Sequence, residues 1–248
     1  MIQLLWLFIL LAFIAEVLGT VGAFGSSVFF VPVAGYFFDF HAVLGITAVF
    51  HLSSNLAKIG LFRKGIDWKL VFLIGIPAVL FSSLGALMTS YVDSKPLQIG
   101  LGIFLVITAA FFIIFKSMAL KPHGVNAVAG GTVSGFLAGF LGSGGPIRGL
   151  TLTAFNLRKE IFVATSAFID LGIDLSRAAI YFGNGYLKKE HIPYILILIV
   201  IAIAGTWTGK KILEKIPAEY FRLIVLVLIL IIGVVTLIGA VFKIEFPK

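Results

Sequence analysis

The chain has 248 residues, of which 60% are hydrophobic and 12% charged, with a formal net charge of +8. This composition excludes a water-soluble globular protein of this length. The lack of cysteine excludes disulfides and thiolate metal sites, and the basic residues form no tail of the kind that binds nucleic acid. The sequence therefore predicts an all-α integral membrane protein.

Eight long apolar runs follow one another along the chain, each close to the ~20 residues that an α-helix needs to span a bilayer. We expect spanning helices over about 2–23, 42–62, 69–91, 96–115, 125–141, 161–182, 191–209 and 218–242. Two shorter runs, 26–38 and 146–156, follow glycine-rich breaks. The first long run carries Glu16 and lacks a basic leader and a clear cleavage site, so we interpret it as a retained span, not a signal peptide.

The two breaks resemble each other in composition and in place. The first reads Gly22-Ala23-Phe24-Gly25-Ser26-Ser27, and the second reads Gly139-Phe140-Leu141-Gly142-Ser143-Gly144-Gly145. Backbone groups freed inside a bilayer need partners, so such breaks persist mainly where they line a cavity or bind something. A broken segment repeated in both halves indicates the binding site of a transporter.

The breaks belong to a longer repeat. The matched segments are Thr47-Ala48 with Thr165-Ser166, and Gly65 with Gly185. A polar linker near Lys121-Pro122-His123-Gly124 separates the halves. We expect a first transmembrane repeat over residues 1–120 and a second over 121–248, each with about four long spans plus one short helix after the glycine break, in one transport domain.

Length and charge favour inverted repeats. As helix, residues 2–38 would measure about 55 Å and residues 125–157 about 50 Å, slightly short of two spans, so each glycine tip stays below the membrane surface. Each hairpin counted as two passes gives five elements per half, and an odd number inverts the second half. In this arrangement eleven loop cations lie on one side of the membrane and five on the other. If the short segments do not cross, the numbers are nine and seven. The positive-inside rule favours the first arrangement, which places both termini outside the cytoplasm. The larger group is Arg63, Lys64, Lys69, Lys116, Lys121, Arg158, Lys159, Lys210, Lys211, Lys215 and Arg222, and the smaller is Lys95, Lys188, Lys189, Lys243 and Lys248.

Six charged residues remain within or beside the apolar runs: Glu16, Lys58, Arg148, Asp170, Asp174 and Arg177. A charge at a helix centre costs roughly 2.5–3.5 kcal/mol, so each needs a partner or a task. Most of them lie on two matched stripes. The first stripe is His51, Asn55 and Lys58, and the second, at the same i, i+4, i+7 spacing, is Asp170, Asp174 and Arg177. We expect the two stripes to face each other across a central site.

Each stripe residue also has a structural interpretation. Lys58 could extend its alkyl stem to the interface. Arg177 could be neutralised by Asp174 three residues earlier. His51 could be a satisfied core histidine. The sequence alone does not decide between these structural interpretations and a role in the central site.

Two acids are candidates to carry a coupled proton. Asp170 has no basic residue within one turn of its own helix, which makes it the stronger candidate. Glu16 lies one turn before the first break and could carry a proton or bond to freed backbone. We expect Asp174 and His51 to take part in the same proton handling.

The second break has the features of an anion site. Pro146 fits the first turn of a short helix, whose exposed N–H groups and positive dipole end attract anions. Arg148 adds a guanidinium fork suited to an oxyanion. The predicted anion-binding residues are Ser26, Ser27, Ser143, Gly144, Gly145 and Arg148, with Thr165, Ser166, Asn55, Lys58 and Arg177 as further members. The alternative is that the glycines permit close helix packing and Arg148 faces lipid headgroups.

The chain resembles the sulfite exporter TauE/SafE family of membrane permeases over about residues 5–240. The matching features are the paired breaks, the two-repeat layout, Ala164-Thr165-Ser166, Asn184-Gly185-Tyr186-Leu187, and the Gly75…Gly85 and Gly205…Gly209 spans. The chain departs from the family pattern in Gly25-Ser26-Ser27, where three glycines are common, and in Pro146-Ile147-Arg148-Gly149. The resemblance implies a multi-span permease for sulfite, sulfonates or other sulfur-containing oxyanions.

We therefore expect a multi-pass transporter of the cell membrane that exports a small anion, such as sulfite or an organosulfonate, by alternating access with a coupled proton. An uncoupled anion channel and a permease for a different small metabolite are the alternatives. An enzyme is not expected, because metal-ligand and nucleophile motifs are lacking, and a nucleotide-driven pump is not expected for want of a phosphate-binding loop. The expected partners are the anion and the lipid bilayer, with no cofactor, no metal and no nucleic acid, and assembly into a homo-oligomer is left open.

Overall fold

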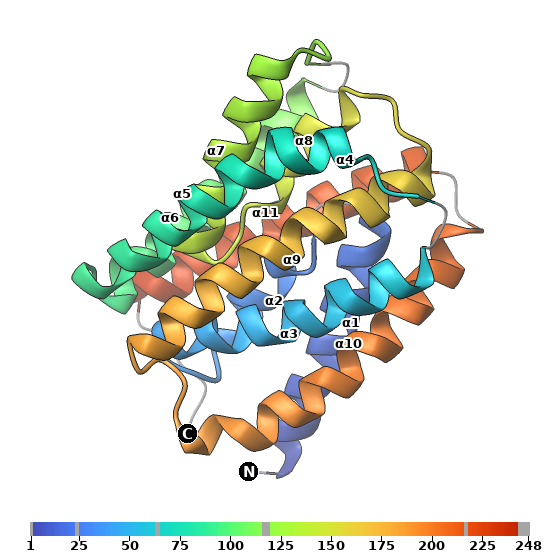
Figure 1. Ribbon diagram of the computed structural model, residues 1–248. Helices are drawn as coiled ribbons and strands as arrows, with labels where there is room; N and C mark the ends of the chain where they lie inside the picture. Colours follow the sequence, from blue (N-terminus) through green and yellow to red (C-terminus); the bar gives the residue numbers. More distant parts are fainter. Residues whose placement is uncertain (1, 23–24, 63–64, 116–119, 216–217, 243–248) are drawn as a thin grey trace.

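The computed structural model describes residues 2–22, 25–62, 65–115, 120–215 and 218–242 as a bundle of α-helices (Figure 1). The long helices are α1 (Ile2–Gly22), α3 (Phe40–Leu61), α6 (Ser94–Ile114), α7 (Gly124–Leu141), α9 (Lys159–Gly183), α10 (Ile192–Leu213) and α11 (Ala218–Phe242). A further span is built from α4 (Trp68–Leu70), the π-helical turn η1 (Val71–Gly75), α5 (Ile76–Met88) and the short η2 (Thr89–Tyr91). The short helices are α2 (Ser27–Ala34), α8 (Gly145–Thr153) and η3 (Lys189–His191).

The predicted fold class is confirmed. Seven helices in the described part of the chain are long and apolar enough to cross a membrane. The eighth long helix, α9, has 25 residues and carries Asp170, Asp174 and Arg177. It packs against α3, the other helix with a polar stripe, and the two run side by side through the middle of the molecule (Figure 1).

Both glycine breaks separate a long helix from a short one, as predicted. Gly25 and Gly142, 117 positions apart, have the same φ of 79°, a left-handed conformation that glycine adopts without the Cβ penalty of other residues. The repeated loop glycines Gly65 and Gly185 also have positive φ values. Ala23 and Phe24 of the first break lie outside the described residues.

Each break is the tip of a helical hairpin. Phe8 of α1 contacts Phe30 of α2 and Phe37 just beyond it, with ring centroids 6.0 and 5.2 Å apart, so α2 returns along α1. Gly130 of α7 lies directly against Thr151 of α8, so α8 returns along α7. In each hairpin the short helix therefore returns toward the end of the bundle at which the long helix begins.

The two halves exchange helices as packing partners. The most extensive contacts join α5 with α7, α6 with α11, α3 with α9, and α1 with α10. In every pair one helix comes from residues 1–120 and the other from 121–248, and each of the two buried hydrophobic clusters contains residues of both halves. The inverted relation between them and the division at residue 120 stay predictions.

One of these contacts is a seam of small residues that the sequence reading missed. Gly131, Gly135 and Gly139 of α7 face the backbone of Ile74 in η1 and of Ala78 and Ser82 in α5, where a Cβ atom would collide. Small residues four positions apart let membrane helices approach closely. This seam fixes α7, and with it the second break, against α5.

Candidate functional site

Glu16 is the centre of the first buried cluster. It is fully buried on α1, and its Oε1 lies 2.9 Å from Lys58 Nζ of α3. Four hydroxyls also donate to its carboxylate, at distances from 2.5 to 3.1 Å: those of Thr20, Ser26, Ser54 and Thr206. Lys58 is buried and also donates to Ser54 at 2.8 Å, so it does not extend to the interface. Among the described residues, Glu16 therefore bonds to side chains of α1 and α3, to Thr206 of α10 and to Ser26, the N-cap of α2.

Ser26, at the start of α2, connects the first break to the polar stripe of α3. Its hydroxyl donates to Glu16 Oε2 at 2.6 Å and lies 3.0 Å from His51 Nε2. His51 is buried, and this contact satisfies one of its ring nitrogens. The break is thus held to both α1 and α3.

Arg177 is the centre of the second cluster. Its Nε and Nη2 contact Asp174 Oδ1 at 2.8 and 2.7 Å, and its Nη1 donates to the carbonyls of Ala138 and Gly142 at 2.9 and 3.1 Å. Asn55 of α3 donates to the other Asp174 oxygen at 2.7 Å. Arg177 thereby satisfies carbonyls at the end of α7 that the break leaves without helical partners. The stripes of α3 and α9 meet, as the sequence predicts.

Arg148 joins the second hairpin to α9. Its Nη1 forms an ion pair with Asp170, and its Nε donates to Ser166 at 3.0 Å. Asp170 has no basic neighbour along its own helix but has one in space. Arg148 is buried, so it does not face lipid headgroups.

The two breaks touch each other. Ser27 donates to Ser143 at 3.4 Å, across 116 positions of sequence. Gly25 lies beside Arg148, whose Nη2 would be 3.6 Å from a Cβ at that position. Gly144, which caps α8 before its first residue Gly145, packs on the backbone of Ser134, so this glycine is required by close packing.

A small cavity lies where these groups meet. Its volume is about 20 Å³, enough for one water molecule. The polar side chains that line it come from both halves: Thr20, Asn55, Lys58, Arg148, Ser166 and Asp170. Arg177, Asp174 and His51 support this cavity from outside its lining.

The charges around the cavity are balanced. Lys58 pairs with Glu16, Arg148 with Asp170, and Arg177 with Asp174. Each cation thus has one carboxylate partner. Pairing of this kind is what allows charges to remain inside a membrane protein.

A second, larger cavity of about 670 Å³ opens at one end of the bundle, and we call it the vestibule. It lies between the α2–α3 loop, the start of α6, the α9–α10 loop and the end of α11. Lys95 and Lys188, which the charge count places on one side of the membrane, both line it. Lys210, from the other predicted side, donates to the carbonyl of Leu61 at the far end of α3. Of the remaining loop cations, Arg63, Lys64, Lys116, Lys243 and Lys248 lie outside the described residues, as does the side chain of Arg222.

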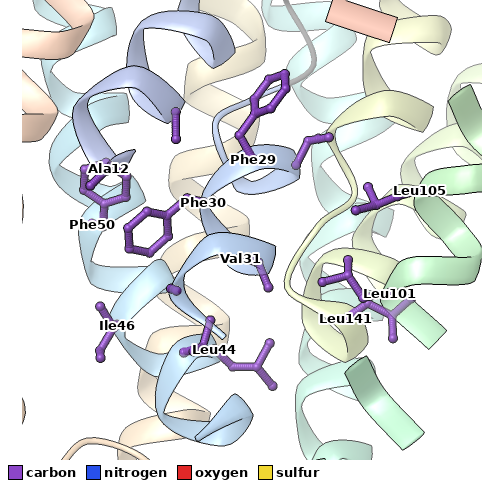
Figure 2. Packing of buried hydrophobic residues seen from close by; sticks show 14 of the residues in the cluster. Ala12, Phe29, Phe30, Val31, Leu44, Ile46, Phe50, Leu101, Leu105 and Leu141 are labelled. Carbon is purple, nitrogen blue, oxygen red and sulfur yellow. The ribbon is translucent and has the colours of Figure 1, made fainter. Parts of the chain in front are cut away.

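An apolar layer separates the vestibule from the small cavity. Along α3, the vestibule-lining Phe40–Ala42 and the polar His51 are about 15 Å apart, at 1.5 Å per residue. The turns between them carry buried Leu44, Ile46 and Phe50, which belong to the same buried cluster as Phe30 and Val31 of α2 (Figure 2). The rings of Phe30 and Phe50 contact each other, with centroids 4.6 Å apart. Buried apolar residues therefore lie along α3 between the vestibule and the charged residues.

Of the predicted site residues, Asn55, Lys58, Arg148, Ser166 and Asp170 line the small cavity, whereas the others do not: Glu16, Ser26, Ser27, His51, Ser143, Gly144, Gly145, Thr165, Asp174 and Arg177. Thr165 instead contacts the N-cap residue of α4. Its hydroxyl accepts a bond from the backbone N–H of Asp67 at 3.0 Å. Its match Thr47 is buried without a hydrogen-bond partner among the described atoms. Conversely, sequence reasoning missed Thr20, Ser54 and Thr206; Thr20 follows Glu16 by four residues and Ser54 precedes Lys58 by four, a same-face spacing that could have identified both.

The residues of this site and the helices that carry them lie in a region of the chain that matches one known protein family. The model of the family described as sulfite exporter TauE/SafE matches residues 8–236. The chain belongs to the sulfite exporter TauE/SafE family. It is therefore a multi-pass transporter of the cell membrane, and the resemblance inferred from the sequence is confirmed.

A curated relative supports the assignment. A protein of Methanocaldococcus jannaschii described as a probable membrane transporter protein is 26% identical over 252 residues, covering 89% of this chain and 90% of the relative. The similarity thus extends over most of the length of both chains.

Proposed function

We propose that this TauE/SafE transporter exports a small sulfur oxyanion, sulfite or an organosulfonate, from the cell without chemically changing it. The anion binds in the small cavity, between the two hairpin tips. The observation that carries this proposal is that Lys58 of the first half and Arg148 of the second line the same cavity. Two cations from different halves of the chain suit a ligand whose oxygens point in several directions.

The size of the cavity and the residues around it support alternating access. A volume of about 20 Å³ is too small for sulfite, which has four non-hydrogen atoms, so the hairpins must separate for the anion to enter. The apolar layer lies on the vestibule side. Both features count against a permanently open channel.

The position of the cavity supports export. Its lining includes Phe162 and Val163, about one turn from Lys159 at the start of α9. Lys159 belongs to the group of loop cations that the positive-inside rule places in the cytoplasm. The anion would therefore load from the cytoplasmic side and leave through the vestibule.

Flux measurements in proteoliposomes test this proposal. Wild-type protein should release radiolabelled sulfite with saturation, and a pH gradient should change the rate. Arg148→Ala should lower kcat/KM by about 10- to 100-fold, the worth of hydrogen bonds to a charged group. Arg158→Ala, which removes an exposed arginine just outside the membrane helices, is the matched control. Unchanged flux and saturation in Arg148→Ala would show that the site assignment is wrong.

A further inference from the structure

Asp170 forms an ion pair with the guanidinium of Arg148, the arginine to which the proposed substrate would bind. Arg148 Nη1 pairs with the Asp170 carboxylate, and both side chains line the small cavity. Arginine binds a carboxylate and a sulfur oxyanion through the same N–H to oxygen contacts. The carboxylate therefore lies in a place that an oxyanion would take.

The two acids of α9 differ in how firmly they are held. Asp174 is bonded by Arg177 through two nitrogens and by Asn55, and its side chain is 2% exposed. Asp170 has Arg148 as its ion partner, and its side chain is 16% exposed, beside the cavity. Asp174 is thus a fixed structural partner, whereas Asp170 is placed to exchange Arg148 for another group.

The charged groups around Asp170 come from three elements. Arg148 approaches from α8, Lys58 from α3 across the cavity with His51 behind it, and Asp174 and Arg177 follow on α9 itself. The described parts of α5, η1 and α7, which also pack on α9, carry no ionisable side chain. When Glu16 is included, the three carboxylates and the three cations of the site are equal in number.

This balance restricts what can enter. A monovalent anion added to the site would leave one negative charge without a partner, and an unpaired charge in a buried site is strongly unfavourable. A proton taken up at the same time removes that cost. Protonation of an Asp170 oxygen forms an O–H bond, cancels the carboxylate charge and frees the Arg148 fork for the anion.

We propose that Asp170 is an intramolecular competitor of the substrate for Arg148, so that one proton binds to Asp170 for each monovalent anion that binds to Arg148. This inference rests on the proposed function and specifies its coupling. The proton and the anion enter from the same side and leave together. The transporter is then a proton–anion symporter with a stoichiometry of one to one.

Anion binding to purified protein in detergent tests the competition directly. Methanesulfonate is the probe, because its charge does not titrate in the working pH range, and sulfite is the second ligand. A pH indicator in weakly buffered solution counts protons. Above the pH at which Asp170 is half protonated in the free protein, wild-type protein should take up about one proton per methanesulfonate bound, and its affinity should fall about tenfold per pH unit. Zero proton uptake per bound anion throughout this pH range would overturn the proposal without any variant.

Two matched variants distinguish competition from a structural role. Asp170→Asn, which keeps the shape but carries no charge, should bind methanesulfonate independently of pH, at least as tightly as wild type at high pH, without proton uptake. Asp174→Asn should keep the proton uptake, although it is less stable. An Asp170→Asn protein that elutes and melts as a folded species but binds at least tenfold more weakly at every pH, or keeps the pH dependence, would contradict the competition. Wild-type protein that binds neither anion at any pH would instead refute the proposed function, and this inference with it.

Discussion

Asn55 and Asp174 lie 119 positions apart at matched places on α3 and α9, and their side chains are hydrogen-bonded at 2.7 Å. The bond joins the two polar stripes at corresponding positions. It also positions the carboxylate that neutralises Arg177, which in turn binds the carbonyls of Ala138 and Gly142. One amide thus connects the first half of the chain to the second break.

Removal of Asp174 should destabilise the protein more than removal of Asn55. Asp174→Ala leaves Arg177 buried without its carboxylate, which costs about 3–5 kcal/mol. Asn55→Ala removes one bond between membrane helices, worth about 0.6–1.7 kcal/mol. Titration with denaturing detergent measures both, with Asn184→Ala, an exposed asparagine, as the control expected to stay within about 0.5 kcal/mol of wild type. Equal effects of Asp174→Ala and Asn184→Ala would show that the pair does not stabilise the fold.

The Glu16–Lys58 pair should show strong coupling in a double-mutant cycle. Glu16→Gln leaves the buried ammonium of Lys58 without its 2.9 Å partner, and Lys58→Met leaves the carboxylate with hydroxyl donors only. Each single change should cost about 3–5 kcal/mol of unfolding free energy. The double variant should cost less than the sum by about 1–3 kcal/mol. Additive losses would mean that the two residues do not depend on each other.

The two left-handed glycines should respond differently to alanine. Gly25→Ala meets nothing closer than 3.6 Å, so it should cost only the left-handed penalty of roughly 1–2 kcal/mol. Gly142→Ala also places its Cβ 2.8 Å from Leu44 Cδ2, which adds about 1–3 kcal/mol of overpacking.

Gly183→Ala is the control for this pair, because Gly183 is helical with open space around its Cα. The thermal midpoint should be highest for Gly183→Ala, lower for Gly25→Ala and lowest for Gly142→Ala. A Gly25→Ala protein less stable than Gly142→Ala would contradict the geometry of the breaks.

The fold was largely predictable because a bilayer imposes one rule on every span. Apolar runs of about 20 residues gave the long helices to within a few residues, and a glycine with polar neighbours marked each break. The matched spacing of His51, Asn55 and Lys58 with Asp170, Asp174 and Arg177 predicted that α3 and α9 would meet. The glycine seam of α7 was overlooked, although its four-residue spacing is visible in the sequence.

The ion pairs of the site were less predictable, because three-dimensional neighbours are not sequence neighbours. Arg177 and Asp174 are three residues apart on one helix, so their pairing was among the sequence interpretations. Lys58 with Glu16 and Arg148 with Asp170 connect different helices, and only the packing of the hairpins brings them together. The same holds for Thr206, which reaches Glu16 across 190 positions.

A structure with bound selenite, a heavier analogue of sulfite whose selenium gives an anomalous signal, tests the central claim most directly. The account predicts a selenium peak between the two hairpin tips, within hydrogen-bonding distance of Arg148, with the Asp170 carboxylate displaced from the guanidinium. The peak should be absent from Arg148→Ala protein soaked in the same way. A peak in the vestibule beside Lys95 and Lys188, with the Arg148–Asp170 pair intact at saturating selenite, would contradict the account.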